Sequence, residues 1–324
     1  MSAPEVSVIV VTYNQESTIG RTLESILAQK CDFDFEIIVG EDASSDQTRR
    51  ICQDYAVRYP EKIRLMPETA NKGIVDNYFD CLANCRGMFV TDCAGDDYWP
   101  EPGRLQVQRD YLRENVSDVA VMSDWLIVEN GQTVLSSRTD RYRMYASRTD
   151  GPTMMTRLLG AINNIPLLSA MMFRKSVTDG ILAMDADMVR RREWGCEDLP
   201  LMVALASKGA FGYLPIAATA YIVGDATVSN NRSDGALFDF YIKAATCLVD
   251  LIGLYAVDPC SVKDNLDSKI SYLAALATSA FSSERSRKLR RLASRWPVSM
   301  PLKARLRLTL MLKLREACAA AKKE

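Results

Sequence analysis

The sequence predicts an α/β fold with a mostly parallel central sheet, followed by a region that is entirely helical. Residues 6–125 alternate between short β-branched runs and amphipathic helical stretches. Alternating strands and helices form Rossmann-like parallel sheets with right-handed crossovers. From residue 236 onward the apolar spacing is helical throughout. Because 324 residues suffice for one large domain and an appendage, we place a sheet domain at residues 1–232 and a helical region at residues 233–324.

The first strand, at residues 6–11, is a continuous β-branched run of the kind that is buried on both faces of a parallel sheet. The next segment carries Ile19, Leu23 and Ile26 on one helical stripe, which predicts a helix. The same two patterns repeat along the chain. They predict further strands at residues 35–39, 63–66, 88–91 and 119–123, and helices at residues 17–29, 46–58, 74–85 and 104–114.

The rest of the sheet domain has a less regular pattern. Asn130 and Gly131 stand between two apolar runs, and this pair favours the turn of a β-hairpin. Residues 136–152 are polar and rich in Arg, Asp and Tyr, so we expect a loop over a site. Later strands are expected at residues 169–173 and 217–223, with a helix at residues 199–208 between them.

The composition excludes several kinds of site. The chain has no histidine, which removes Ser-His-Asp triads, Cys-His pairs and a histidine general base. Its nine cysteines include no CxxC pair, so a zinc site is not expected. Acid–base chemistry must therefore come from Asp, Glu, Lys, Tyr or Cys.

The cysteine count and the charge distribution bear on location. An odd number of cysteines, with no signal-peptide pattern at the N-terminus, predicts reduced thiols and a cytoplasmic protein. From Arg285 to the end there are thirteen Lys/Arg and two Asp/Glu. Such a basic tail indicates an anionic partner. We interpret the tail as a peripheral attachment to the inner face of an anionic cytoplasmic membrane; a solvated helix packed on the rest of the chain is the alternative. Nothing indicates a nucleic-acid partner.

Polar clusters follow three of the predicted strands. They are Thr12-Tyr13-Asn14, Glu41-Asp42 and Gly95-Asp96-Asp97. Ligands of open α/β sheets bind outside the carboxyl ends of the strands, so these clusters are candidates for one site. Neighbouring carboxylates repel each other unless they bind a cation or a donor-rich ligand. A divalent metal that holds a diphosphate fits Asp96 and Asp97, because hard cations take oxygen ligands.

Five motifs together resemble one enzyme family. The chain contains, in this order, VSVIVVTYN, EIIVGEDASSDQT, an Asn71-Lys72-Gly73 turn, GDDYW and EDLPL. Their order and spacing resemble the family 2 inverting glycosyltransferases with the GT-A fold, in particular bacterial members that build surface polysaccharides. The resemblance covers roughly residues 5–230. It implies a nucleotide-sugar donor, with UDP as the nucleotide, and a glycan or lipid-linked acceptor.

The resemblance also assigns roles to matching residues. The carboxylate of Asp42 would accept a hydrogen bond from the uracil ring, because a carboxylate accepts and a ring N–H donates. Asp96 would hold a divalent metal, Mn or Mg, with Asp97 close to the ribose or the donor sugar. The nucleotide-binding residues implied by the family motifs are Thr12, Tyr13, Glu41, Asp42, Asn71, Gly73 and Asp97.

The EDLPL motif supplies the implied catalytic pair, Glu197 and Asp198. Asp198 would be the general base that deprotonates the acceptor hydroxyl, so that one in-line displacement inverts the sugar. We expect Asp198 to stand at a helix N-terminus, where the helix dipole would lower its pKa and keep it ionised. We expect the side chain of Glu197 to point in a different direction from that of Asp198, because neighbouring residues on a helix do not face each other.

Two departures from the family pattern weaken the expected metal site. The position two residues before Asp96 usually holds an acid, and here it is Ala94. Many relatives carry a Tyr-Arg-x-His stretch near the end of the domain, which here reads Tyr221-Ile222-Val223-Gly224. A catalytically inactive nucleotide- or glycan-binding relative is therefore an alternative. A nucleotidyltransferase is a second rival, which the absence of a Gly-rich basic loop after the first strand disfavours.

Overall fold

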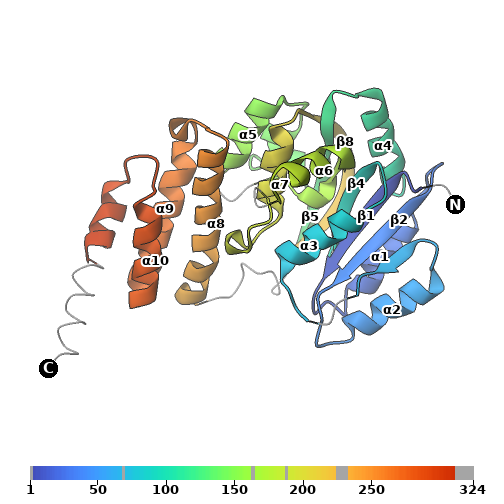
Figure 1. The fold of residues 1–324 in the computed structure, drawn as a ribbon, viewed down its shortest axis with the longest axis horizontal. Helices are drawn as coiled ribbons and strands as arrows, with labels where there is room; N and C mark the ends of the chain where they lie inside the picture. Colours follow the sequence, from blue (N-terminus) through green and yellow to red (C-terminus); the bar gives the residue numbers. More distant parts are fainter. Residues whose placement is uncertain (1–2, 68–69, 162–164, 187–188, 224–232, 311–324) are drawn as a thin grey trace. The chain divides into compact units, whose positions relative to one another are not determined.

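The computed structural model describes residues 3–67, 70–161, 165–186, 189–223 and 233–310 of the chain (Figure 1). By its contacts the chain divides into two compact units. Unit 1 consists of residues 1–155, 164–192 and 196–224, and unit 2 of residues 156–163, 193–195 and 225–324.

Unit 1 is built on an eight-stranded sheet within the described residues. Seven strands follow the order β3-β2-β1-β4-β7-β5-β6, and β8 pairs with β5. The strands are β1 (Val6–Thr12), β2 (Phe35–Glu41), β3 (Ile63–Leu65), β4 (Phe89–Ala94), β5 (Asp118–Glu129), β6 (Gln132–Leu135), β7 (Met171–Arg174) and β8 (Ala210–Val223).

The pairing confirms the predicted parallel core. It adds two strands that run in the opposite direction, β6 and β7. β1 pairs in parallel with β2 and β4, and β2 pairs in parallel with β3. β5 does not pair with β4. The short strand β7 lies between them, antiparallel to both. β8 then runs parallel to β5, so the sheet as a whole remains mostly parallel.

Helices cover both faces of this sheet. The helices of unit 1 include α1 (Ile19–Leu27), α2 (Thr48–Arg58), α3 (Ile74–Asn84), α4 (Arg104–Glu114), α6 (Lys175–Met184) and α7 (Asp198–Ala206). Buried side chains of α1, α2 and α4 form one core with alternate residues of β1, among them Val8 and Val10. On the other face the amide of Asn77 in α3 donates a hydrogen bond to the carbonyl of Gly40, at 2.7 Å.

Several predicted elements match closely, but β8 begins at Ala210 rather than at residue 217, and one predicted loop differs. The helix at Arg104–Glu114 has the predicted bounds, and Asn130 and Gly131 both have positive φ in the predicted hairpin turn between β5 and β6. The expected loop at residues 136–152 is wrong in part. It contains two 3₁₀ helices, Ser136–Arg138 and Arg143–Tyr145, and it runs into α5 (Gly151–Gly160).

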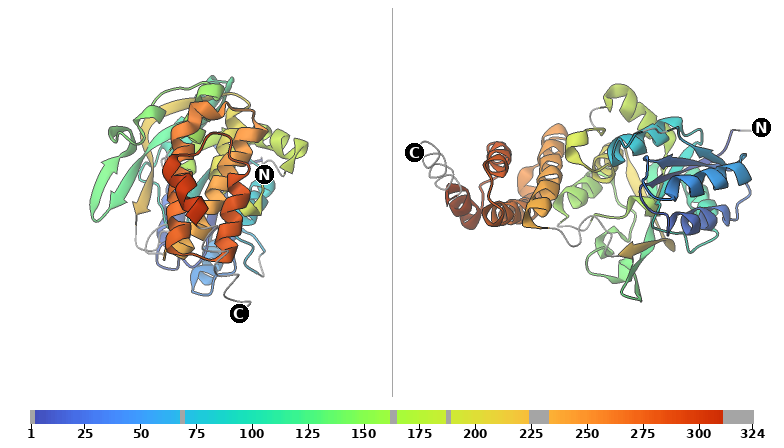
Figure 2. Two further views of the ribbon diagram at one scale, coloured as in Figure 1. Left: turned by 90° about the vertical axis from the view of Figure 1, so that its left-hand side faces the viewer. Right: turned by 90° about the horizontal axis from the view of Figure 1, so that it is seen from below.

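Unit 2 is helical, as the sequence predicted. Its helices α8 (Asp234–Leu254), α9 (Lys263–Ser279) and α10 (Ser283–Ala293) lie side by side (Figure 2). Buried apolar residues on all three helices, such as Ile242, Leu266 and Leu289, form its interior. The hydroxyl of Ser282 caps α10 by accepting a hydrogen bond from the amide of Arg285, at 3.1 Å. A further helical stretch covers residues 302–310.

Across the described residues, none of the helices combines the length and the apolarity that crossing a membrane requires.

Candidate active site

The end of β1 is tied to the acidic loop that follows β4. The hydroxyl of Thr12 donates a hydrogen bond to Oε1 of Gln15, at 2.8 Å. The side chain of Gln15 in turn hydrogen-bonds to Asp96. A Cβ atom added to Gly95 would stand 2.6 Å from the hydroxyl oxygen of Thr12, so only glycine allows this approach. The structure therefore brings two of the predicted site residues, Thr12 and Asp96, to one edge of the sheet.

The loops after β1 and β2 are joined to each other. The amide of Asn14 donates to the hydroxyl of Ser44, and the amide of Ser45 donates to Oδ1 of Asn14, both at 2.9 Å. Asn14 has a φ of 53°, which asparagine tolerates better than most residues. Tyr13 beside it is 48% exposed. Its ring is thus available to a ligand at the same edge.

Asp42, Asn71 and Gly73 form one hydrogen-bonded group. The two carboxylate oxygens of Asp42 accept hydrogen bonds from the backbone amides of Lys72 and Gly73, each at 2.9 Å. The side-chain amide of Asn71 donates to the backbone carbonyl of Asp42, at 3.1 Å. Gly73 has φ 85° and ψ 161°, a conformation essentially confined to glycine. This turn fixes the direction of the Asp42 carboxylate.

Glu41 has a different environment from its neighbour. Its side chain is fully buried, with one carboxylate oxygen accepting from the amide of Ser44 at 2.6 Å and the other from Arg49 at 2.8 Å. Both oxygens thus take part in bonds within the protein. Glu41 holds the loop after β2 in place, and Asp42 faces the turn at residues 71–73.

Asp97 is buried and its neighbour Asp96 is partly buried. Burial raises the pKa of Asp96, against the opposing effects of hydrogen bonds and of Arg21. Burial and the nearby Asp96 raise the pKa of Asp97 well above its usual range. Arg21 also donates a hydrogen bond to the backbone carbonyl of Asp96, at 2.9 Å. A bound cation would stabilise the ionised forms of these two carboxyl groups, which burial disfavours.

Glu197 and Asp198 lie near a further acid that the sequence did not place with them. The phenol of Tyr78 donates a hydrogen bond to Asp92, at 3.1 Å. Burial raises the pKa of Asp92 to about 7, and the nearby Asp198 adds to the shift. Burial also raises the pKa of Glu197 to about 8, with the charges of Asp198 and Asp92 adding to it. We call Asp92, Glu197 and Asp198 the acid cluster.

The expected low pKa of Asp198 is wrong. α7 begins at Asp198, and the amide of Leu199 donates to its carboxylate at 2.6 Å, which favours the ionised form. Burial outweighs this effect, so the pKa of Asp198 is raised. The charge of Asp198 also contributes to the raised pKa of Glu197, so the two carboxyl groups affect each other electrostatically. The expected direction of the Glu197 side chain stays a prediction.

Asp92 connects the acid cluster to the acidic loop. It lies on β4, four residues before Asp96, and its charge raises the pKa of both Asp97 and Glu197. Arg104 opposes this repulsion, because its charge lowers the pKa of Asp92. Acidic residues therefore extend from Asp92 in β4 to Asp96 and Asp97 in the loop that follows the strand.

Arg104 is a buried cation that sequence analysis did not single out. Its guanidinium donates to the hydroxyls of Thr91, at 2.6 Å, and Thr219, at 2.8 Å. It also lies over the ring of Trp99, with 4.0 Å from its carbon to the ring centre. It thereby joins β4, β8 and the GDDYW segment. A lone arginine at the start of a helix gives no local signal of such a position.

A network of ion pairs supports the turn at residues 71–73. Lys72 pairs with Asp80 of α3 at 2.7 Å. Arg190 pairs with Asp80 at 2.7 Å and with Asp76 at 2.8 Å. The segment before α7 is thus tied to α3 and to the residue whose amide binds Asp42. The two pairs of Arg190 could not be predicted from the sequence, because their partners are more than 100 residues away along the chain.

The acidic loop offers few side-chain oxygens to a metal ion. No group of three metal-ligating side chains converges within the described residues. Asp96 and Asp97 supply carboxylate oxygens, and Ala94 supplies none where the family pattern has an acid. The residues fit a divalent cation that takes most of its oxygens from a bound diphosphate rather than from the protein.

Comparison with known proteins gives this site a family. Residues 7–182, more than half of the chain, match the family described as Glycosyl transferase family 2. The chain belongs to this family. The match includes β1, β2 and the acidic loop, and it ends before the acid pair at the start of α7.

Curated relatives of this family 2 chain match shorter stretches. An uncharacterized protein of Mycobacterium tuberculosis (strain ATCC 25618 / H37Rv) is 41% identical over 106 residues, which are 33% of this chain and 31% of that protein. The putative glycosyltransferase EpsE of Bacillus subtilis (strain 168) is 37% identical over 114 residues, which are 35% of this chain and 40% of that protein. The chain thus spans about a third of the length of the first of these relatives.

Solved structures resemble the chain over nearly its whole length. TarS 1–349 of S. aureus, in complex with UDP-GlcNAc, has a TM-score of 0.56 at 18% identity and covers 97% of this chain and 92% of its own. The mannosyltransferase PcManGT of Pyrobaculum calidifontis, in complex with GDP-Man and Mn²⁺, has a TM-score of 0.54 at 18% identity and covers 98% and 87%. The predicted GT-A fold is confirmed.

Proposed function

We propose that this family 2 chain is an inverting glycosyltransferase that moves a sugar from a UDP-sugar to a hydroxyl of a glycan or lipid-linked acceptor in cell-surface polysaccharide biosynthesis. One observation carries the proposal. Three sets of residues stand at or near the carboxyl ends of the strands, where α/β sheets bind ligands. They are the hydrogen-bonded group around Asp42, the acidic loop at Asp96 and the acid cluster at Asp198.

The nucleotide binds in this proposal at the ends of β1 and β2. Asp42, held by the amides of Lys72 and Gly73, accepts a hydrogen bond from the ring N–H of uracil. The exposed ring of Tyr13 covers the base. Thr12 and Asn71 shape the pocket walls, and Glu41 keeps the loop after β2 in position through Arg49.

The diphosphate lies beside Asp96 and Asp97. A divalent cation, Mn or Mg, bound there supplies positive charge that stabilises the leaving diphosphate. Asp96 holds the cation, and Gln15 keeps the Asp96 carboxylate in place. Asp97 accepts a hydrogen bond from the amide of Ile222, so only part of its carboxylate is available to ribose or donor sugar.

The acid cluster supplies the general base. A base works best when its pKa lies near the operating pH. Burial raises the pKa of Glu197 to about 8 and also raises the pKa of Asp198 above its usual range. Asp198 takes the proton from the acceptor hydroxyl, and the hydroxyl oxygen attacks the anomeric carbon from the face opposite the diphosphate. The UDP leaves as the new glycosidic bond forms, which inverts the configuration. Burial holds the pKa of Asp198 above its usual range.

An inactive relative that binds nucleotide is the second candidate. Ala94 and the stretch at residues 221–223 remove ligands that the family pattern supplies. A panel of nucleotide sugars with Mn²⁺ or Mg²⁺ separates the two candidates. Binding is scored by thermal shift, and turnover by release of free nucleotide with glycan acceptors or water. Binding with turnover supports the transferase, whereas binding without turnover on every acceptor supports the inactive relative.

The basic tail places the enzyme beside a lipid-linked acceptor in this proposal. In the described helical stretch at residues 302–310, Leu302, Leu306 and Leu310 share one face and are 68%, 60% and 47% exposed. Lys303, Arg305 and Arg307 flank them. Apolar side chains between basic ones are typical of helices that lie on an anionic membrane surface. The protein is thus cytoplasmic and peripheral at the inner face of the membrane; residues 311–324 of the tail lie outside the described part.

A further inference from the structure

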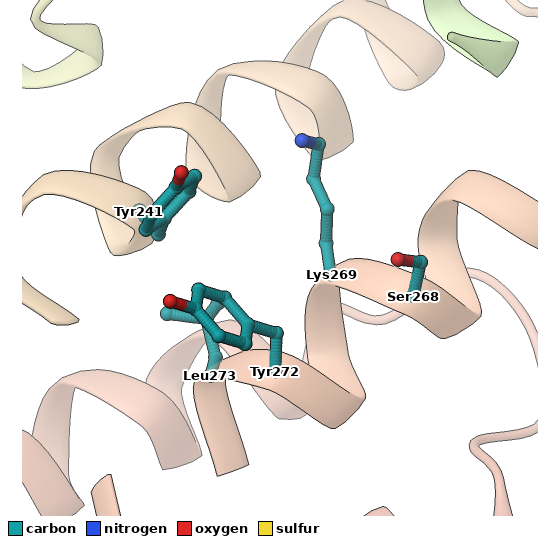
Figure 3. A pocket seen from close by; sticks show the side chains of 5 residues that line it. All are labelled: Tyr241, Ser268, Lys269, Tyr272 and Leu273. Atoms are coloured by element: carbon teal, nitrogen blue, oxygen red, sulfur yellow. The ribbon is translucent and has the colours of Figure 1, made fainter. Parts of the chain in front are cut away.

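Helices α8 and α9 enclose a pocket that lies outside the proposed catalytic site (Figure 3). The pocket has a volume of about 250 Å³. Ligand pockets for drug-sized molecules run from roughly 300 to 1,000 Å³, so this one suits a single ring rather than a large ligand. It is lined by Tyr241 from α8 and by Ser268, Lys269, Tyr272 and Leu273 from α9.

Two tyrosine rings form one side of the pocket. The rings of Tyr241 and Tyr272 meet edge to face, with 5.1 Å between their centres and 85° between their planes. Phe240 supports Tyr241 in a second edge-to-face contact at 5.2 Å. Tyr272 nevertheless leaves 43% of its surface exposed. The result is a rigid aromatic surface that remains open to solvent.

The other side of the pocket is polar. Figure 3 shows the side chains of Lys269 and Ser268 on the side away from the two rings. The phenols and the serine hydroxyl both donate and accept hydrogen bonds, and the ammonium of Lys269 donates. Burial and the nearby Tyr272 raise the pKa of Tyr241, so its phenol stays protonated at neutral pH.

We propose that this pocket binds one unit of an acidic saccharide. A sugar ring presents C–H groups on its faces and hydroxyls around its edge. The C–H groups match the negative face of an aromatic ring, and the hydroxyls match the phenols and Ser268. Among the five lining residues there is one cation and no carboxylate, which favours a sugar that carries an acidic group.

Other occupants match the lining less well. A lipid chain needs an apolar lining, and Leu273 is the single aliphatic residue among the five. A nucleic-acid backbone needs several cations along a groove, and Lys269 is one. The inference rests on the proposed function in one respect: the saccharide would be a distal unit of the growing glycan acceptor, bound by unit 2.

Binding of saccharide can be measured without nucleotide, so it is separate from catalysis. Calorimetry on the full chain would use a hyaluronan hexasaccharide as the acidic probe and cellohexaose as the neutral one. We expect the acidic probe to bind more tightly. Raising the salt concentration should weaken the acidic probe and leave the neutral one nearly unchanged, because salt screens the lysine's charge.

Single substitutions test each side of the pocket. Tyr272→Ala should weaken both probes about tenfold, and Tyr272→Phe, which keeps the ring, should weaken them much less. Lys269→Met should remove the preference for the acidic probe. Lys288→Met removes one charge from the same unit outside the pocket and is the matched control. Melting curves check the fold of each variant, and the exposure of Tyr272 makes its substitution tolerable.

The pocket proposal is overturned if neither probe binds the wild-type chain at millimolar concentration. It is also overturned if Tyr272→Ala and Lys269→Met both bind like the wild type while folded. Sugar transfer by a chain that binds neither probe would defeat the pocket alone. Probe binding by a chain that transfers no sugar would defeat the proposed activity alone.

Discussion

The carboxylate of Asp97 accepts a hydrogen bond from the backbone amide of Ile222, with 3.1 Å between the two atoms. This bond joins the acidic loop after β4 to the end of β8, where many relatives carry a Tyr-Arg-x-His stretch. Here the segment contributes a backbone amide in place of a basic side chain. In the proposed function, the charge of a bound diphosphate would therefore be balanced largely by the cation that it brings.

The first prediction follows for metal binding. Calorimetry with Mn²⁺ alone should show weak binding, and the affinity should rise when UDP is present, because the diphosphate supplies oxygens that the protein lacks. Asp96→Asn should abolish the UDP-dependent part. Asp179→Asn, at an exposed acid of α6, is the control and should change nothing. Tight binding of Mn²⁺ without nucleotide would mean that the ligands lie elsewhere.

The second prediction concerns the turn that holds Asp42. Gly73→Ala should destabilise the fold by about 1–3 kcal/mol, because a side chain is strained at this φ and ψ. It should also weaken UDP binding, since the amide of Gly73 would move away from Asp42. Gly180→Ala is the matched control: the helical Gly180 has open space around its Cα, so alanine should stabilise slightly. Denaturant unfolding and UDP calorimetry measure both effects. Equal stability of the two variants would refute the strain.

The third prediction concerns pH. A base acts in its ionised form, and burial raises the pKa of Asp198, so the transfer rate should rise with pH as Asp198 loses its proton. Glu197→Gln removes the second acid of the pair. The rising limb of the profile should then stay at the same pH or move to lower pH. Glu114→Gln, at an exposed residue, should leave the profile unchanged. A shift to higher pH would contradict the coupling.

The fourth prediction concerns the tail. The full chain should sediment with vesicles that contain anionic lipid at low salt and remain free of neutral vesicles. Replacing Leu302, Leu306 and Leu310 together by serine should reduce this binding at least tenfold, since apolar burial and charge act together. Deleting residues 285–324 is a poorer test, because Leu289 and Leu292 are buried. No binding of the full chain to anionic vesicles would end the membrane proposal.

Local patterns were enough to predict the first half of the sheet. Each of β1, β2 and β4 is a short apolar run bounded by polar residues, and α1 has a clear apolar stripe. The insertion of β7 between β4 and β5 had no such signal. That pairing joins Thr91 to Met172, residues far apart in the sequence. The packing of the whole domain, rather than a local pattern, determines that β7 lies between β4 and β5.

The candidate site shows the same division. The motifs predicted that Thr12, Asp42 and Asp96 would be close. Gln15 links Thr12 to Asp96, and the backbone amide of Asp42 donates a hydrogen bond to the carbonyl of Thr12, at 3.0 Å. The position of Asp92 near Asp198 could not be predicted, because the tertiary fold, rather than the spacing of the motifs, brings the two acids together. The helix-dipole argument gave the wrong direction for the pKa of Asp198, because burial outweighs the effect of the dipole.

The central claim is that Asp198 is the base of a sugar transfer. The direct test is the rate of nucleotide release, with donor, Mn²⁺ and acceptor, by the wild type, by Asp198→Asn and by Glu197→Gln. The account predicts that Asp198→Asn keeps donor binding and loses transfer by roughly a hundredfold or more, while Glu197→Gln loses less. Transfer by Asp198→Asn at close to the wild-type rate would contradict it.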